Sequence, residues 1–207
     1  MKRDRSLGIL ILLLVGVSAS TAQNQAVTNY HKVEIKASFI SIHGETNVNK
    51  FNCEVNKPSL NDSIVVKNIW SNQKLEFQGL KLIYKVGDFK CGIRAMEPDF
   101  RELLKAEEEP FVVLQLNAIT LHPNNDAFER LDVEADVDIF IAGVRRQIVV
   151  QHGQVINHSS AHMTFKGDKQ LLMTDFDIEP PAKFLGMVKV ANDIRVEFAI
   201  EMVVSAL

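Results

Sequence analysis

The sequence predicts an all-β protein whose antiparallel strands form one barrel or sandwich. Apolar and polar residues alternate with a period of two in several segments, which is the pattern of strands with one buried and one solvated face. Turn residues divide these segments by mostly short connections, as in antiparallel meanders. With 207 residues, 46% of them hydrophobic, the chain suits one domain with a single core.

The N-terminal residues 1–22 are expected to be a cleaved signal peptide. A basic start precedes an apolar run from Leu7 to Val17, and the small residues Ser20 and Ala22 follow, as at a signal-peptidase site. The run is about half of the roughly 20 residues that a membrane span needs. We therefore expect an exported protein, periplasmic or secreted, whose mature domain is 23–207.

The charge of the chain argues against nucleic-acid partners. The formal net charge is −3, and the signal peptide takes away three positive charges and one negative charge, which leaves −5. An acidic domain is repelled by phosphate polymers and by anionic lipid surfaces. Neither nucleic-acid binding nor stable membrane insertion is expected.

The strands are read from the alternation. The clearest are expected at 32–39, 80–86, 133–141 and 194–202, and weaker ones at 48–56, 63–70, 111–121, 145–152, 160–166 and 170–178. Turns are expected at Ala142-Gly143 and Gly167-Asp168, among others, because such residues adopt turn conformations readily.

One short helix is expected at 98–107. Pro98 suits the first turn of a helix, and Phe100, Leu103 and Leu104 share one face. The helix should end before Pro110.

The two cysteines, Cys53 and Cys91, lie in similar Phe-x-Cys settings. In an oxidising compartment an isolated pair favours a disulfide, although two independent buried thiols are the alternative. Neither cysteine has a neighbouring His or Cys that would complete a metal site.

Motifs for catalysis or metal binding are not found, and we predict no catalytic residue, no metal and no enzyme activity. The sequence has no phosphate loop, no nucleophile elbow and no His-Glu-x-x-His. His158 and His162 are expected about 13 Å apart on extended backbone, too far to act together on one ion.

Several blocks resemble the YceI-like family, in the order in which the family has them, over roughly residues 30 to 203. The blocks are Asn47 to Cys53, Met96 to Pro110, Ile141 to Arg146, Phe165-Lys166-Gly167 and Met173 to Pro181. The helix block and the Thr-Asp-Phe-x-Ile-Glu-Pro-Pro block are the specific ones. The cysteine pair resembles a Bacteroidetes-type subset of the family. The chain departs from the family at Arg145, where Thr is usual, and at Asp177, where Gly is more frequent.

The resemblance implies an antiparallel up-and-down, lipocalin-like β-barrel of about eight strands that holds a polyisoprenoid or similar long lipid, for transport or storage, without chemistry. No other cofactor is implied. The alternative is a secreted barrel with a self-filled interior that acts as an envelope or protein-interaction module. The oligomeric state is open, and a homodimer is allowed.

The ligand is expected among inward-facing apolar side chains, because a small barrel is filled either by its own residues or by an apolar ligand. These candidates are Leu82, Tyr84, Phe111, Val137, Ile139, Phe165, Phe176, Phe198 and Ile200. Arg145 and Arg146, at or just after the Ala142-Gly143 turn, are candidates for contacting a polar head group; the alternative is that both are solvated surface charges.

Overall fold

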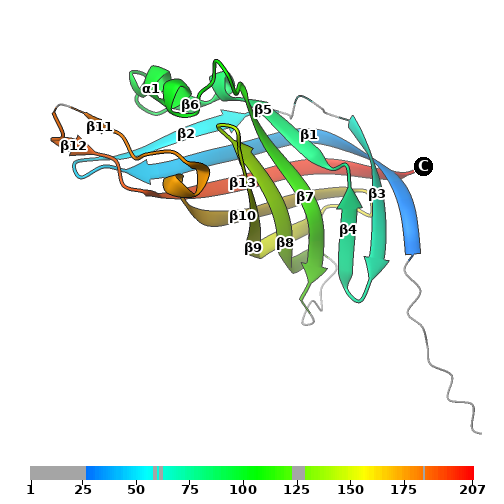
Figure 1. Ribbon diagram of the computed structural model, residues 1–207. Coiled ribbons are helices and arrows are strands. Elements are labelled where there is room, and N and C mark those ends of the chain that lie inside the picture. Colours follow the sequence, from blue (N-terminus) through cyan, green and yellow to red (C-terminus); the bar gives the residue numbers. More distant parts are fainter. Residues whose placement is uncertain (1–26, 58–59, 61–62, 123–128, 184) are drawn as a thin grey trace, which may run out of the picture.

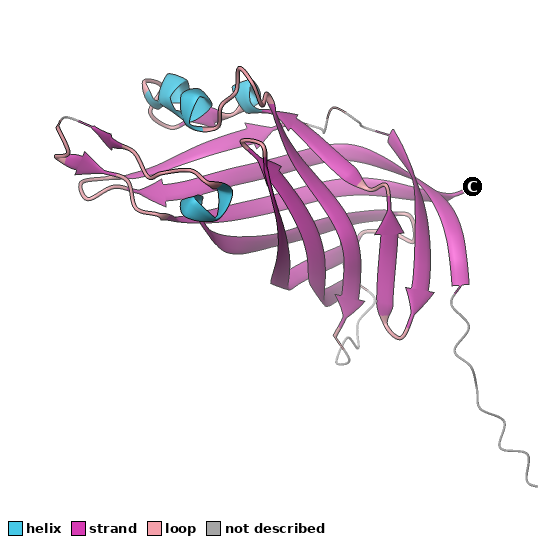
Figure 2. Ribbon diagram, in the orientation of Figure 1, coloured by secondary structure: helices cyan, strands magenta, loops and turns pink. Residues whose placement is uncertain are grey.

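The computed structural model describes residues 27–57, 60, 63–122, 129–183 and 185–207; the predicted signal peptide lies outside this part of the chain. Antiparallel strands dominate it (Figure 2). The strands are β1 (Val27–Glu45), β2 (Lys50–Asn56), β3 (Ser63–Ser71), β4 (Lys74–Gln78), β5 (Lys81–Lys85), β6 (Lys90–Cys91), β7 (Phe111–Leu121), β8 (Arg130–Ile141), β9 (Val144–Asn157), β10 (His162–Leu172), β11 (Ala182–Lys183), β12 (Val188–Lys189) and β13 (Asp193–Ala206). The helices are η1 (Val86–Asp88), α1 (Met96–Leu103) and η2 (Met173–Phe176), and none of those described is long and apolar enough to cross a bilayer.

A ring of 8 strands forms a barrel, and this confirms the predicted fold class. The order around the ring is β1-β13-β10-β9-β8-β7-β4-β3, and β3 pairs with β1 to close it. Strands β1, β13 and β10 form one side, and β7, β8 and β9 cross them on the other (Figure 1). The hairpin of β11 and β12 projects at one end of the molecule, far from the C-terminus (Figure 1).

Strand β1 serves two parts of the barrel. Its first half, Val27–Glu34, pairs with β3, whereas Phe39–Glu45 pairs with β2, and β13 follows it over both halves. A register shift between Ile35 and Ala37 marks a bulge, and bulges bend a strand and increase its twist. The bend lets one strand belong to the ring and also carry the extension formed by β2 and β6.

The disulfide prediction is confirmed. Cys53 on β2 and Cys91 on β6 are bonded, with their Cα atoms 3.9 Å apart. The bridge ties the segment that follows β5 back to β2, next to α1.

The barrel wall is incomplete between β9 and β10. These strands pair only from Met163↔Asn157 to Lys166↔Gln154. Beyond that point β10 pairs with β13 alone as far as Leu172, and β9 pairs with β8 alone as far as Val144. We call this unpaired stretch the β9–β10 gap.

The core is the inner face of the barrel. On β8 the inward residues Val133, Ala135, Val137, Ile139 and Ile141 are all buried, with exposed fractions from 0% to 9%. This confirms the alternation read from the sequence, and burial of each Val or Ile side chain stabilises the fold by about 1.5–3 kcal/mol.

The predicted helix is placed differently. It begins at Met96 and ends at Leu103, instead of covering 98–107. Lys105 has φ +53°, a left-handed conformation that a helix cannot continue through. The amphipathic face is retained, because Phe100 and Leu103 pack against the core.

The expected turn at Gly167-Asp168 is wrong, because β10 runs straight through it. A Cβ on Gly167 would lie 3.0 Å from Cζ of Phe198, so the glycine makes room for an interior ring instead of bending the chain. The strand expected at 170–178 ends at Leu172, where η2 begins. Strand β4 was not predicted.

Candidate functional site: an apolar cavity inside the barrel

The interior of the barrel encloses a cavity of about 80 Å³. Its wall comes from β1, β5, β7, β8, β9, β10 and β13, together with Leu80 and Phe89. A cavity of this size has room for a few water-sized spheres, and its lining is almost entirely aliphatic or aromatic. A long ligand can therefore occupy the interior only if side chains of the lining move aside.

Most of the predicted ligand-binding residues line this cavity. They are Leu82, Val137, Ile139, Phe165, Phe198 and Ile200. They come from four strands, β5, β8, β10 and β13. Phe165 and Phe198 form an aromatic pair whose ring centroids lie 5.1 Å apart.

Phe176 and Tyr84 are buried in the core but do not line the cavity. Phe176 belongs to η2, and its ring is 1% exposed. Tyr84 faces inward on β5, and burial raises the pKa of its hydroxyl, which the neighbouring Ser38 hydroxyl lowers by less. The Ser38 hydroxyl donates a hydrogen bond to the Lys57 carbonyl.

Phe111 lies outside the barrel, so its placement in the ligand site is corrected. It is 41% exposed at the start of β7. The inward residues of this strand are Val112, Leu114 and Leu116, all of which line the cavity, and the period of two then turns Phe111 outward.

Arg145 also points away from the interior. Its guanidinium donates to the Oδ2 atom of Asp138 at 2.7 Å, to which Asn117 Nδ2 also donates at 3.0 Å. Asp138 is only 1% exposed although it lies on the outer face of β8. The hydrogen bond from Arg145 lowers the pKa of Asp138, against an opposing effect of burial. This arginine is therefore engaged in covering a buried carboxylate.

Arg146 stands opposite Ile139 in the β8–β9 register, on the inward side of the strand. Its side chain is nevertheless 43% exposed, 3.6 Å from Asp177 Oδ1 and bonded to the Arg145 carbonyl. Neither arginine lines the cavity. Asp177 has φ +56°, a left-handed conformation that glycine adopts more readily than other residues.

The charged residue that does line the cavity is Lys169, which the sequence reasoning missed. It lies on β10 opposite Val196, and its inward neighbours along the strand include the buried Phe165 and Leu171. The alternation Phe165, Gly167, Lys169, Leu171 carried this signal, but the expected turn at Gly167 interrupted the strand before it reached Lys169.

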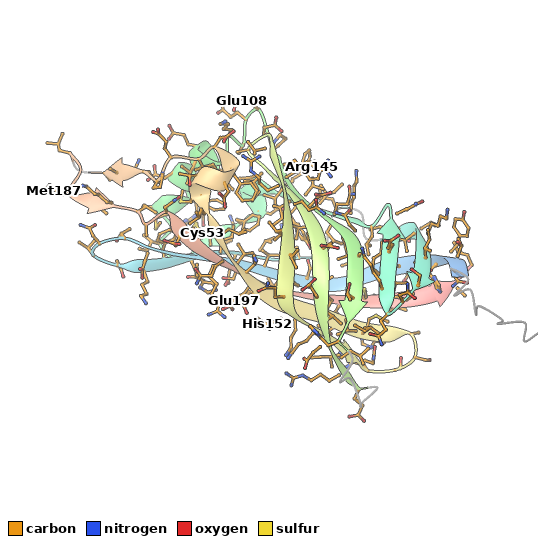
Figure 3. All side chains as sticks on the ribbon, turned by 60° about the horizontal axis from the view of Figure 1, so that its bottom comes forward. Cys53, Glu108, Arg145, His152, Met187 and Glu197 are labelled. Atoms are coloured by element: carbon orange, nitrogen blue, oxygen red, sulfur yellow. A yellow bond between two sulfur atoms is a disulfide. The ribbon has the colours of Figure 1, made fainter. Side chains whose placement is uncertain are left out.

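A hollow of about 410 Å³ lies on the outer face where β9, β10 and β13 meet. His152 and Glu197, labelled near each other in Figure 3, both line it. Phe198 lines this hollow as well as the interior cavity. Phe198 is therefore part of the wall between the two spaces, beside the β9–β10 gap.

His158 and His162 are closer than predicted, with ring centroids 4.8 Å apart, because a tight turn joins β9 to β10. The Nε2 atom of His158 contacts Thr164 Oγ1 at 2.9 Å, and that of His162 contacts Glu201 Oε1 at 2.7 Å. Within the described residues, no group of three or more His, Cys, Asp or Glu side chains could hold a metal ion.

Comparison with solved structures finds several similar chains. A polyisoprenoid-binding domain from Saccharophagus degradans, implicated in plant cell wall breakdown, superposes with a TM-score of 0.57 at 12% identity, over 84% of this chain and 98% of its own. BcnA from Burkholderia cenocepacia gives a TM-score of 0.46 at 13% identity, over 82% of this chain and 96% of its own. A YceI protein from Campylobacter jejuni gives 0.46 at 16% identity, over 61% and 72%.

No protein-family model and no curated protein matches the chain. The structural likeness bears on the fold, which agrees with the resemblance seen in the sequence blocks. The described part of the chain thus has a YceI-like fold, an antiparallel β-barrel with one α-helix.

Proposed function

We propose that the protein binds one polyisoprenoid or similar long apolar lipid inside its barrel and holds it for transport or storage without transforming it. The observation that carries the proposal is the interior cavity, whose lining is apolar apart from Lys169. Ligand sites in small barrels have this concave, mainly apolar character. The Saccharophagus degradans domain, described as polyisoprenoid-binding, adds support through its shared fold.

The proposal includes export. The basic and apolar start of the chain has the order of a signal peptide, and a disulfide suits an oxidising compartment such as the periplasm. A homodimer and the Bacteroidetes-type assignment stay predictions. The latter rests on the cysteine pair.

A second function is favoured by a different observation. The cavity is small, and large apolar side chains are exposed at the turn between β11 and β12, where Leu185 is 105% and Met187 69% exposed. Exposed apolar groups at a projecting tip are a feature of interaction surfaces. A barrel with a filled interior that contacts an envelope component or another protein is therefore the alternative.

The two functions are separated by the lipid content of the protein. The full-length protein, expressed with its leader and purified without detergent, is extracted with organic solvent, and the extract is quantified by mass spectrometry against the protein concentration. Lipid binding predicts one long-chain species approaching one molecule per chain. Protein that carries no lipid, and takes up none when mixed with polyprenols and refolded, would favour the alternative.

A further inference from the structure

We propose that Lys169 holds an anionic group at the end of the bound lipid, so that the barrel selects apolar chains ending in a phosphate or a carboxylate over neutral ones. This inference rests on the proposed lipid-binding function and adds the class of ligand. It starts from one lysine whose aliphatic chain lines an otherwise apolar cavity.

Lys169 faces the interior. It stands directly opposite Val196 in the β10–β13 register, and both residues line the cavity. Asp168 and Gln170, on either side of it in the sequence, are exposed, whereas Leu171 is buried. Lys169 itself is half-buried, as expected when a lysine lays its aliphatic chain against an apolar surface and keeps its ammonium group in water.

No acidic partner accounts for this position. Among the described residues, the Lys169 side chain makes no hydrogen bond and no ion pair, and no carboxylate lines the cavity. The neighbouring Asp168 is engaged by Arg195, whose Nε lies 3.1 Å from its Oδ2 atom. The Lys169 Nζ atom is not among the buried side-chain atoms that lack a partner, so it keeps access to water. Its positive charge can therefore form a charge-assisted hydrogen bond with an anion that the ligand delivers.

The β9–β10 gap explains how an anionic end could be placed there. Lys169 lies on the part of β10 that has lost β9 as a neighbour, and Phe198 separates the interior from the outer hollow at this point. An apolar chain can then lie among the interior side chains while its charged end stays beside the gap, close to water. The two arginines proposed from the sequence are less suited to hold this anionic end. Arg145 is bonded to Asp138, and Arg146 lies 3.6 Å from Asp177 Oδ1.

The test compares ligands with the same chain and different ends. Geranylgeranyl phosphate, geranylgeranoate and geranylgeraniol are titrated by calorimetry into delipidated full-length protein, into Lys169→Met and into Lys169→Arg. Lys166→Met is the matched control, because Lys166 lies three residues earlier on β10 and faces the outer hollow. Thermal unfolding verifies that each variant is folded; Met keeps the length of the side chain and should fold at least as well.

We expect the wild type to bind at least one of the two anions about tenfold more tightly than the alcohol, as a charge-assisted hydrogen bond provides. Lys169→Met should remove this preference by weakening the binding of the anion. Lys169→Arg and Lys166→Met should keep the preference. If Lys169→Met loses the preference over the alcohol for only one of the two anions, that anion is the one that Lys169 holds.

Equal affinity of the wild type for all three ligands, or an undiminished preference in Lys169→Met, would overturn the role of Lys169 and leave lipid binding in place. Failure of all three ligands to bind the wild type would overturn both the role of Lys169 and the proposed function.

Discussion

Replacement of Ile139 by Trp should fill the cavity and expel the lipid while the barrel stays folded. Ile139 is 5% exposed and faces the cavity from the middle of β8. Trp adds roughly 60 Å³ of side-chain volume in a close-packed interior, and the cavity measures about 80 Å³. The added indole therefore fills most of the free space that a bound lipid chain would occupy first.

The expected change in stability is small because two effects oppose each other. Overpacking of a core costs about 1–3 kcal/mol, whereas filling an existing cavity regains van der Waals contacts. We expect the free energy of unfolding, measured in urea, to fall by no more than about 2 kcal/mol. Bound lipid should fall at least tenfold, which corresponds to a loss of about 1.4 kcal/mol of binding free energy.

The assay is lipid content per folded chain, obtained by extraction and mass spectrometry, with urea unfolding in parallel. Val65→Trp is the control. Val65 is 59% exposed on β3, so this substitution places the same indole outside the barrel. The control should retain lipid as the wild type does. A folded Ile139→Trp protein with undiminished lipid would refute the reasoning and place the site elsewhere.

Three further predictions follow from the structure and the sequence. Replacing Cys53 and Cys91 by Ala should lower the free energy of unfolding by about 4 kcal/mol, as expected for a loop of 38 residues; unchanged urea unfolding would contradict this. Arg145→Gln should raise the lowered pKa of Asp138. Because that carboxylate stabilises the fold above its unfolded pKa of about 3.9 and loses this effect as pH falls through its folded pKa, the variant should be less stable than the wild type at pH 7, with a deficit that shrinks towards pH 3. A constant deficit in urea unfolding at both pH values would argue against the pair. Finally, intact-mass measurement of exported protein should place the mature N-terminus at or near Gln23, and retention of residues 1–22 would count against a signal peptide.

What could be predicted from the sequence depended on local pattern. Strand β8 alternates without interruption from Val133 to Ile141, and the structure buries every inward residue of that series. The Ala142-Gly143 turn follows the same logic, with positive φ at both residues, as a tight hairpin turn requires.

The errors arose where local pattern and long-range packing disagree. Gly167 looks like a turn residue, but it is a strand residue that leaves room for the Phe198 ring. Phe111 is a large aromatic residue of the kind that packs in cores, but the register of β7 turns its side chain outward. The β9–β10 gap depends on how two strands diverge around a twisted barrel, a property of the whole sheet that no segment encodes by itself.

In the candidate site, too, local pattern predicts some residues correctly and long-range packing decides the others. Alternation alone brings Val137, Ile139 and Phe198 to the inner face. The sequence marks Arg145 and Arg146 only by their position near a turn, and the structure reveals that Asp138 and Asp177 pair with them.

The most direct test of lipid binding inside the barrel is photo-cross-linking with a polyprenol that carries a diazirine near the free end of its chain. After irradiation, peptide mapping by mass spectrometry locates the adducts. Binding in the cavity predicts adducts on interior residues such as Leu114, Phe198 and Ile200, and their loss in Ile139→Trp. Adducts confined to exposed residues such as Leu185 and Met187 at the β11–β12 turn would contradict it and assign the lipid to the surface.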